Sequence, residues 1–337
     1  MIFFRVDANK EIGMGHLMRC LSIADSLRMN KKQVAFICAK DTDTTIIEKR
    51  GFDFCVLSTA YTDMMAEVAT ITELLMSMES EMYIVDTYQV SRDYLFALKP
   101  FTKLCLIEDI HDTKYPVDVI INYNLYAEGL DYSDVYPGTK LLLGPKYAPV
   151  RNEFVNTNFS VKNKAKSIMV TTGGADMYNL SELICEKLLA REETHDLNIN
   201  LISGALNANL PKLQEIAKAH GNVTVYSNVS NMAELMEAND VAITAAGSTV
   251  CELLCVGVPF ACVSFVDNQK LLYEYCKNSK VCLCASNYET DGEAAIDEII
   301  EKVVSCLDSH AKRMEVSKQG KQIVDGNGAM RIARELL

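Results

Sequence analysis

Short runs of apolar residues alternate with helical patterns along the first half of the chain. The runs typical of buried strands cover residues 2–6, 33–38, 82–85, 103–107 and 117–121. Between them, residues 16–29 and 62–78 carry apolar side chains at three- and four-residue spacing, which predicts amphipathic helices. Strands that are apolar almost throughout and are separated by helices indicate a parallel sheet with both faces buried.

The same rhythm restarts after residue 165. Strand-like runs cover 167–172, 197–202, 223–226, 241–244 and 260–265, and from about 290 to the end the pattern is helical. Helical patterns between these strands begin near 179, 211, 231 and 248. The predicted fold class is therefore α/β, with two doubly wound, Rossmann-like domains, parallel sheets and a cleft between the domains.

The stretch between the two halves, residues 122–165, is less periodic and holds Pro137, Pro145 and Pro149. We place the interdomain linker in it, and expect an N-terminal domain over 1–150 and a C-terminal domain with its helices over 151–337. A chain of 337 residues suits two domains at roughly 150 residues each.

The charge balance restricts the classes of partner that the chain is expected to bind. With 33 basic and 45 acidic side chains, the formal net charge is −12, which disfavours nucleic acid and anionic lipid as partners. No apolar run approaches the roughly 20 residues that cross a bilayer, so no membrane insertion is expected. The N-terminus lacks the pattern of a secretion signal, and we expect a cytoplasmic protein of unspecified oligomeric state.

The twelve cysteines lie mostly in apolar runs, where cysteine behaves as a small hydrophobic residue. We expect free thiols in a reducing compartment. Two close pairs, Cys251 with Cys255 and Cys282 with Cys284, lack the second pair or the histidines of a zinc site. The sequence therefore predicts no metal site.

The first loop, R-V-D-A-N-K-E-I-G-M-G-H-L-M-R-C at 5–20, joins a strand to a helix. Gly13 and Gly15 allow the backbone to approach a ligand, and His16 opens the helix, where the dipole favours its neutral, basic form. A histidine that merely caps the turn is the alternative. Met18 stands where a dinucleotide fingerprint needs a third glycine, so no dinucleotide cofactor is expected.

Two loops of the second half lead from strands into helices. In T-T-G-G-A-D-M-Y-N-L at 171–180, capping explains Asp176 better than it explains Asn179.

In A-A-G-S-T-V-C-E-L-L at 245–254, the residues Gly247, Ser248 and Thr249 offer backbone N–H groups and hydroxyls at a helix N-terminus, a ready anion site. Glu252, one turn on, can accept hydrogen bonds from a ribose diol. The alternative is a capping box formed by Thr249 and Glu252.

Further polar residues follow apolar strands. Asn268 and Gln269 could bind sugar hydroxyls or N-acetyl groups, although capping by Asp267 or Asn268 is the alternative. Four more cleft candidates are Asp86, Tyr88, Glu108 and Asp109. The other four histidines are interpreted as solvated: His111, His195, His220 and His310.

Together these motifs resemble those of the UDP-sugar hydrolases of pseudaminic acid biosynthesis, which release 2,4-diacetamido-2,4,6-trideoxy-L-altrose from its UDP conjugate. The resemblance covers nearly the whole chain and is most specific at 5–20. It is also carried by V-D-T-Y at 85–88, G-G-A-D-M-Y-N at 173–179, the loop at 245–254, D-N-Q at 267–269 and V-D-G-N-G-A-M-R-I-A at 324–333. Thr87 departs from the family, which often has histidine there, and the helical extension beyond 290 is reduced in some relatives.

The resemblance implies the GT-B fold shared with MurG-type glycosyltransferases, and a UDP-sugar and water as partners, with no cofactor or metal. It implies that His16 is the catalytic base, that Glu252 binds the ribose, and that water attacks the anomeric carbon with inversion and C–O cleavage. The expected substrate-binding residues are Gly13, Gly15, Tyr88, Asn179, Gly247, Ser248, Thr249, Glu252, Asn268 and Gln269.

Three other functions fit parts of the sequence. A GT-B glycosyltransferase with a UDP-sugar donor would share the nucleotide half, although little basic or apolar surface is offered to a membrane-bound acceptor. A catalytically silent sugar-nucleotide binding protein would keep the loops without turnover. A non-hydrolysing epimerase would need acid and base residues that do not stand out.

Overall fold

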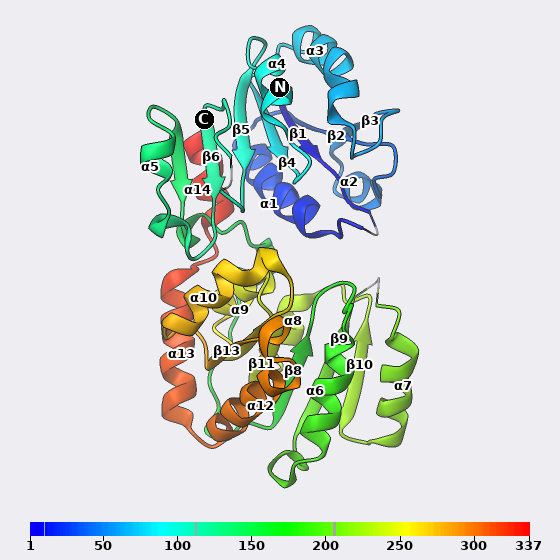
Figure 1. The fold of residues 1–337 in the computed structure, drawn as a ribbon, viewed down its shortest axis with the longest axis vertical. Coiled ribbons are helices and arrows are strands. Elements are labelled where there is room, and N and C mark those ends of the chain that lie inside the picture. The colour runs from blue at the N-terminus through cyan, green and yellow to red at the C-terminus, as the bar shows by residue number, and fades with distance from the viewer. Residues whose placement is uncertain (10, 112, 205–206) are drawn as a thin grey trace. The chain divides into compact units, whose positions relative to one another are not determined.

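The apolar runs of the first half form a parallel sheet in the computed structural model of the chain, which describes residues 1–9, 11–111, 113–204 and 207–337 (Figure 1). The order of the strands is β3-β2-β1-β4-β5-β6-β7. They are β1 Ile2–Val6, β2 Val34–Cys38, β3 Asp53–Val56, β4 Met82–Asp86, β5 Lys103–Ile107, β6 Val119–Asn122 and β7 Lys140–Leu143. The α-helices that accompany them are α1 Gly15–Met29, α2 Thr45–Lys49, α3 Val68–Ser77, α4 Arg92–Leu98 and α5 Tyr132–Val135. Short 3-10 turns are η1 Met64–Glu67, η2 Ala127–Gly129 and η3 Pro145–Tyr147.

The second half builds another parallel sheet, in the order β10-β9-β8-β11-β12-β13. Its strands are β8 Ser167–Thr171, β9 Asn198–Ser203, β10 Val223–Ser227, β11 Val241–Ala245, β12 Phe260–Ser264 and β13 Cys284–Asn287. The α-helices are α6 Leu180–Leu189, α7 Leu210–Ala219, α8 Met232–Glu237, α9 Thr249–Val256, α10 Lys270–Asn278, α11 Tyr288–Asp291, α12 Glu293–Leu307, α13 His310–Ile323 and α14 Gly328–Leu336. The 3-10 turns are η4 Asn152–Phe154, η5 Glu192–Thr194 and η6 Asp267–Gln269.

Both sheets reverse their strand order at one internal position, between β1 and β4 in the first and between β8 and β11 in the second. The described strand pairs on either side of these positions are parallel. The predicted α/β class with two doubly wound parallel sheets is confirmed. In such sheets ligands bind beyond the carboxyl ends of the strands, beside the reversal. The loops that follow these four strands are therefore where a site belongs.

The strongest apolar runs of the sequence occupy the middle of each sheet. Strands β1 and β4 are buried along their whole length, as are β8 and β11. Helices cover both faces, so these strands have no solvent side and their side chains do not alternate. Fully burying one large apolar side chain stabilises a fold by about 1.5–3 kcal/mol, and these strands supply many.

Three strands were not predicted from the sequence: β3, β7 and β13. Strand β13 lies between the predicted strand at 260–265 and the helical region predicted from about 290. Each is four residues long and lies at an edge of its sheet. An edge strand has one neighbour, and β3 is exposed throughout; its apolar run is short, with three apolar residues in D-F-C-V. The expectation of a linker over 122–165 is wrong for β7 and the turns around it, which are ordered parts of the first unit.

The chain forms two units, one of Met1–Arg151 with Asn327–Leu337 and the other of Asn152–Gly326. We expected residues 151–337 to form one domain, and the structure differs at the C-terminus because α14 belongs to the first unit. Helix α14 contacts α1 and η3.

The contacts of α14 explain its position. Ala329, Ile332 and Ala333 form a buried stripe at three- and four-residue spacing. A side-chain carbon on Gly328 would lie 2.1 Å from the carbonyl oxygen of Ala148, so the close approach needs a glycine. The sequence pattern gives the helix but not the surface on which it packs.

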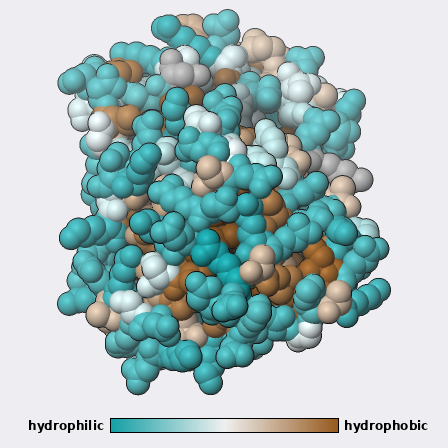
Figure 2. Space-filling model, turned by 60° about the horizontal axis from the view of Figure 1, so that its bottom comes forward, coloured by the Kyte–Doolittle hydropathy of each residue, from teal (hydrophilic) through white to brown (hydrophobic). Residues whose placement is uncertain are grey.

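Hydrophilic side chains cover most of the face drawn in Figure 2, with smaller hydrophobic areas between them. Among the helices of the described residues, none combines the length and the apolar character that a bilayer crossing needs.

Candidate functional site

His16 is the second residue of α1 and is buried at the carboxyl edge of the first sheet. Its Nδ1 lies 2.6 Å from Oδ1 of Asp86, the last residue of β4. The two meet because β1 and β4 are hydrogen-bonded neighbours, which brings their following loops together. Met14 occupies the N-cap position of α1, so His16 is not the residue that caps the turn.

A ring of contacts surrounds His16. Asp86 accepts two hydrogen bonds from Arg19, from Nε at 2.6 Å and from Nη2 at 2.5 Å. Arg19 also donates from Nη1 to Asp109 at 2.8 Å, and the Tyr88 hydroxyl donates to the same carboxylate at 3.2 Å. The ring of Tyr88 then meets the imidazole of His16 edge to face, with centroids 4.7 Å apart. These five side chains, His16, Asp86, Arg19, Asp109 and Tyr88, form the histidine network.

The network keeps Asp86 ionised. Burial by itself raises the pKa of Asp86, but the Arg19 guanidinium and His16 outweigh it and hold that pKa well below its ordinary value. A carboxylate 2.6 Å from Nδ1 accepts a hydrogen bond from the N–H of that nitrogen. Nε2 of a neutral His16 then carries the lone pair, as a general base requires.

A pocket opens beside the network, lined by His16, Arg19, Asp86, Thr87, Tyr88, Val90, Leu106, Ile107, Glu108, Asp109, Ile110 and Tyr115. Its volume is about 50 Å³. One water needs roughly 10–15 Å³ by this measure, so the pocket has room for a few waters.

The start of the first loop has a structural role. Arg5 is fully buried and pairs with Glu67 through Nε at 2.8 Å and with Asp7 through Nη1 at 2.6 Å. Asp7 also accepts hydrogen bonds from the backbone of Ala39 and the hydroxyl of Thr42. The R-V-D part of the motif therefore ties β1 to the loop after β2, and the chemistry of the motif lies further along.

The two glycines of this loop differ. Gly13 has a φ of +77°, which favours glycine, and its N–H donates to the carbonyl of Asn9 at 2.8 Å. Gly15 has an ordinary backbone, and a side-chain carbon there would meet nothing within 4 Å. The fold requires Gly13, whereas Gly15 leaves open space next to His16.

In the second unit, Asp176 performs the capping that the sequence suggested. Its carboxylate accepts from the backbone N–H groups of Leu180 at 2.8 Å and Ser181 at 3.1 Å. Asn179, at the N-cap position of α6, is exposed, has a φ of 54°, and makes no capping hydrogen bond through its side chain. The side-chain amide of Asn179 therefore does not cap α6.

The loop after β11 leads into α9, which begins at Thr249. Ser248 holds the N-cap position, is exposed, and makes no capping hydrogen bond through its side chain. Because the helix starts one residue earlier than a Thr249–Glu252 capping box requires, Thr249 is not the N-cap and that alternative is wrong. Gly247 has open space around it, and Glu252 lies half-buried in the first turn.

The third loop of this unit follows β12. Asn268 is exposed, whereas the side-chain oxygen of Gln269 accepts from the backbone N–H of Phe265 at 3.1 Å. The side-chain oxygen of Gln269 therefore stabilises the loop. Tyr178 packs against Phe265 at 5.9 Å and against Tyr288 at 5.8 Å between ring centroids, which joins the loops after β8, β12 and β13.

Sequence reasoning missed two features of the first unit. It did not single out Arg19, although its place three residues after His16 puts both on one face of α1. It also interpreted His111 as solvated, which is wrong. The His111 ring packs on Tyr132 at 4.0 Å and pairs through Nε2 with Asp131 at 2.5 Å.

The structure thus brings His16 and Tyr88 together in the first unit. In the second unit, the other predicted residues follow β8, β11 and β12, which are adjacent strands of one sheet. The first group can exchange a proton, and the second can hold an anion and bind hydroxyls.

Comparison with known proteins shows similarity to nucleotide-sugar enzymes in name and to GT-B structures in fold. Residues 167–329 match the glycosyltransferase family 28 C-terminal domain. The chain is 30% identical, over 80% of its length, to an uncharacterized protein of Methanocaldococcus jannaschii, and spans 56% of that protein. It is 28% identical, over 80% of its length, to the UDP-2,4-diacetamido-2,4,6-trideoxy-beta-L-altropyranose hydrolase of Campylobacter jejuni, of which it covers 93%.

Among solved structures, the crystal structure of Acinetobacter baumannii MurG is similar with a TM-score of 0.70, covering 99% of this chain and 98% of that one. At 12% identity this likeness shows the fold alone. The relatives include a hydrolase named for the substrate of the family that the first-loop motif resembles. The chain has the GT-B fold, and its residues 167–329 are similar to the C-terminal domain of family 28 glycosyltransferases.

Proposed function

We propose that the chain hydrolyses a UDP-linked 2,4-diacetamido-2,4,6-trideoxy sugar to the free sugar and UDP, in pseudaminic acid biosynthesis in the cytoplasm. The observation that carries the proposal is the contact of His16 with an ionised Asp86 beside a water-sized pocket. The similarity to the Campylobacter jejuni hydrolase supports the substrate class.

Asp86 acts through His16. By accepting a hydrogen bond from Nδ1–H, the carboxylate fixes the tautomer whose Nε2 is basic, and it stabilises the imidazolium that forms when His16 takes a proton. Arg19 compensates the buried charge of Asp86 and holds it in place through two hydrogen bonds. The edge of Tyr88 limits the motion of the imidazole ring.

The second unit binds UDP in this proposal. The N-terminus of α9 offers backbone N–H groups to the diphosphate, and Ser248 and Thr249 add hydroxyls. Glu252 accepts from the ribose, while Asn179, Asn268 and Gln269 contact the sugar.

The reaction then has one chemical step. Nε2 of His16 removes a proton from water as the water oxygen attacks the anomeric carbon. The bond from that carbon to the phosphate oxygen breaks, and UDP leaves with its charge held by helix dipoles, so no metal ion is invoked. Attack opposite the leaving group inverts the anomeric configuration and places the water oxygen on the sugar.

Hydrolysis in oxygen-18 water tests this step, with UDP-linked 2,4-diacetamido sugars as substrates. We expect the label in the sugar and none in UDP, because the C–O bond is cleaved. Label in UDP would contradict the proposal.

His16→Asn should lower UDP release by about 10²–10⁴-fold and leave UDP affinity unchanged. His220→Asn, at an exposed position of the second unit, is the matched control and should retain activity. Full turnover by His16→Asn would remove His16 from the mechanism.

A glycosyltransferase is the second candidate, favoured by the match of residues 167–329 to a glycosyltransferase domain. It would use the same UDP half and pass the sugar to an acceptor hydroxyl. Incubation with the UDP-sugar and no acceptor separates the two functions. Stoichiometric release of free sugar favours the hydrolase, whereas release that depends on an added acceptor favours the transferase.

A further inference from the structure

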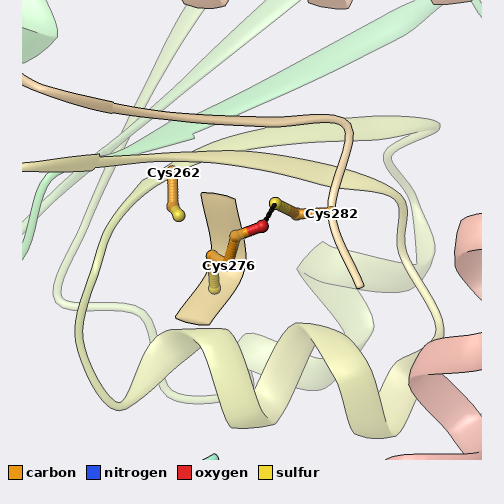
Figure 3. Close-up of side chains that lie close together, drawn as sticks. All are labelled: Cys262, Cys276 and Cys282. Atoms are coloured by element: carbon orange, nitrogen blue, oxygen red, sulfur yellow. Dashed lines mark hydrogen bonds between the residues drawn. The ribbon is translucent and has the colours of Figure 1, made fainter. Parts of the chain in front are cut away.

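Three cysteines from separate segments of the second unit come together in its core. Cys262 lies on β12, Cys276 on α10, and Cys282 in the turn before β13 (Figure 3). Their sulfur atoms all lie within 4.8 Å of one another, and all three residues are buried. Among the residues that the structure describes, this is the group of His, Cys, Asp and Glu side chains with the spacing of a metal site.

We propose that Cys262, Cys276 and Cys282 form a binding site for one thiophilic metal ion, with Cu⁺ as the ion that suits it. Soft thiolate sulfur selects soft ions, and Cu⁺ is the softest of the common biological ones. The proposal is independent of the sugar chemistry proposed above.

The distances fit such an ion. Three sulfurs bound at about 2.3 Å to a central ion in a trigonal plane lie about 4.0 Å apart. The observed limit of 4.8 Å means that closing the site moves the sulfurs by less than about 1 Å. Side-chain rotation at Cys282 can supply this, because that residue lies in a turn and retains 8% exposure.

The number of ligands favours Cu⁺ over Zn²⁺. A structural zinc site takes four protein ligands in a tetrahedron, and the group contains three. A zinc ion would need a water as the fourth ligand, and water has little place among fully buried Cys262 and Cys276. Three-coordinate thiolate binding leaves no such vacancy.

Binding replaces thiol protons. In the structure, the Cys282 thiol donates weakly to the carbonyl oxygens of Cys276 at 3.6 Å and Cys284 at 3.4 Å, and Figure 3 draws the first of these. Each thiolate–metal bond formed from a thiol releases one proton to the buffer and ends such a contact. No oxidation is involved.

The site links the two segments on either side of a turn that carries proposed substrate residues. Cys262 precedes and Cys276 follows the turn Asp267–Gln269, which holds Asn268 and Gln269. An ion bound to both cysteines would cross-link β12 to α10. We therefore expect the bound ion to slow hydrogen exchange in 265–278 and to raise the melting temperature of the chain.

The test titrates the reduced full-length chain with Cu⁺ under anaerobic conditions, against a chromophoric Cu⁺ chelator. Native mass spectrometry then counts the ions, and a pH indicator in weak buffer counts the protons. We expect one ion per chain with proton release in the wild type. Cys282→Ser, which changes one atom, and Cys276→Ala should lose this binding. Cys185→Ala is the matched control, since Cys185 is also a buried helical cysteine of the second unit, and it should bind as the wild type does.

Several outcomes would overturn the proposal. Equal binding by the wild type and both cluster variants would place the ion on other thiols, and no binding by the reduced wild type would leave the group as apolar packing. If a cluster variant unfolds, Cys262→Ser takes its place. Loss of two titratable thiols on addition of the ion would show that a disulfide forms instead of a metal complex.

Discussion

The fourth strand in the order of each sheet ends in a different kind of residue in the two units. In the first, β4 ends at Asp86, a buried carboxylate held by Arg19 and His16. In the second, β11 ends at Ala245 and leads into Gly247 and Ser248, which have no charge. The strand orders correspond except that the first sheet has one more strand, so the difference lies in the strand ends and the loops that follow them.

The physical demands on the two loops are opposite. A buried carboxylate is stable only when other groups compensate its charge, so the first site requires a connected network of side chains. A helix N-terminus presents backbone donors with no side chain at all, and it works best where side chains do not block the approach. One unit is thus suited to moving a proton and the other to holding an anion. The following predictions test that distinction, from the largest expected effect to the smallest.

Replacing Asp86 by Asn should damage the first unit most. Arg19 would lose two hydrogen bonds to a charged carboxylate and keep Asp109 as its remaining carboxylate partner. At roughly 1.5–3 kcal/mol for each hydrogen bond, this costs about 3–6 kcal/mol in the free energy of unfolding. Loss of the tautomer control should lower UDP release by on the order of 10⁴-fold. Urea unfolding and initial-rate assays measure the two effects.

The control is Asp297→Asn in the second unit, where the carboxylate pairs with Lys187 at an exposed site. Such a pair contributes about 0–1 kcal/mol. If Asp86→Asn were as mild as this control, the carboxylate would not be the centre of the network.

The same carboxylate makes stability sensitive to acid. The folded pKa of Asp86 is depressed below the unfolded value of about 3.9, so its contribution is complete above that pH and is lost as the pH falls through the folded pKa. Below about pH 4, the free energy of unfolding should therefore fall more steeply in the wild type than in Asp86→Asn. Urea midpoints measured across this range check it, and parallel slopes would contradict it.

Gly247→Ala should affect the anion site and spare the fold. A side-chain carbon there meets nothing within 4 Å in the protein, but it would stand where a phosphate approaches the helix N-terminus. Loss of one hydrogen bond to a charged group costs roughly 1.5–3 kcal/mol, or about 10–100-fold in UDP affinity. Isothermal titration with UDP measures this. Gly221→Ala is the control, because a side-chain carbon at Gly221 also meets nothing within 4 Å, and it should leave UDP affinity unchanged. Unchanged affinity in Gly247→Ala would show that the phosphates do not bind at this helix N-terminus.

Tyr88→Phe should have the smallest effect. It keeps the ring against His16 and removes the hydroxyl that donates to Asp109. Because Tyr88 is 47% exposed, we expect the activation free energy of UDP release to rise by about 1 kcal/mol or less. Tyr88→Leu, which also removes the ring, should cost more, and the two would be equal if the ring did not restrain His16.

How far the sequence predicted the fold depended on burial. Buried strands such as β1 and β5 were predicted because an apolar run in a globular chain of this composition usually forms a buried strand. The edge strands β3 (D-F-C-V) and β7 (K-L-L-L) have only three apolar residues each, and the prolines around β7 suggested a linker. The sequence also gave no indication that α14 packs on α1, since chain neighbours do not determine which surface covers an apolar stripe.

The candidate site divides in the same way. Local sequence determined the strand-to-helix loops, the place of His16 and the open helix start at Gly247, because glycine, strand ends and helix starts are short-range features. Only the tertiary structure decided that Asp86 and Arg19, 67 positions apart, complete the site, and that Cys262, Cys276 and Cys282 share one point of the core. Such contacts depend on how parallel strands order themselves in a sheet, and that order follows from packing the whole chain.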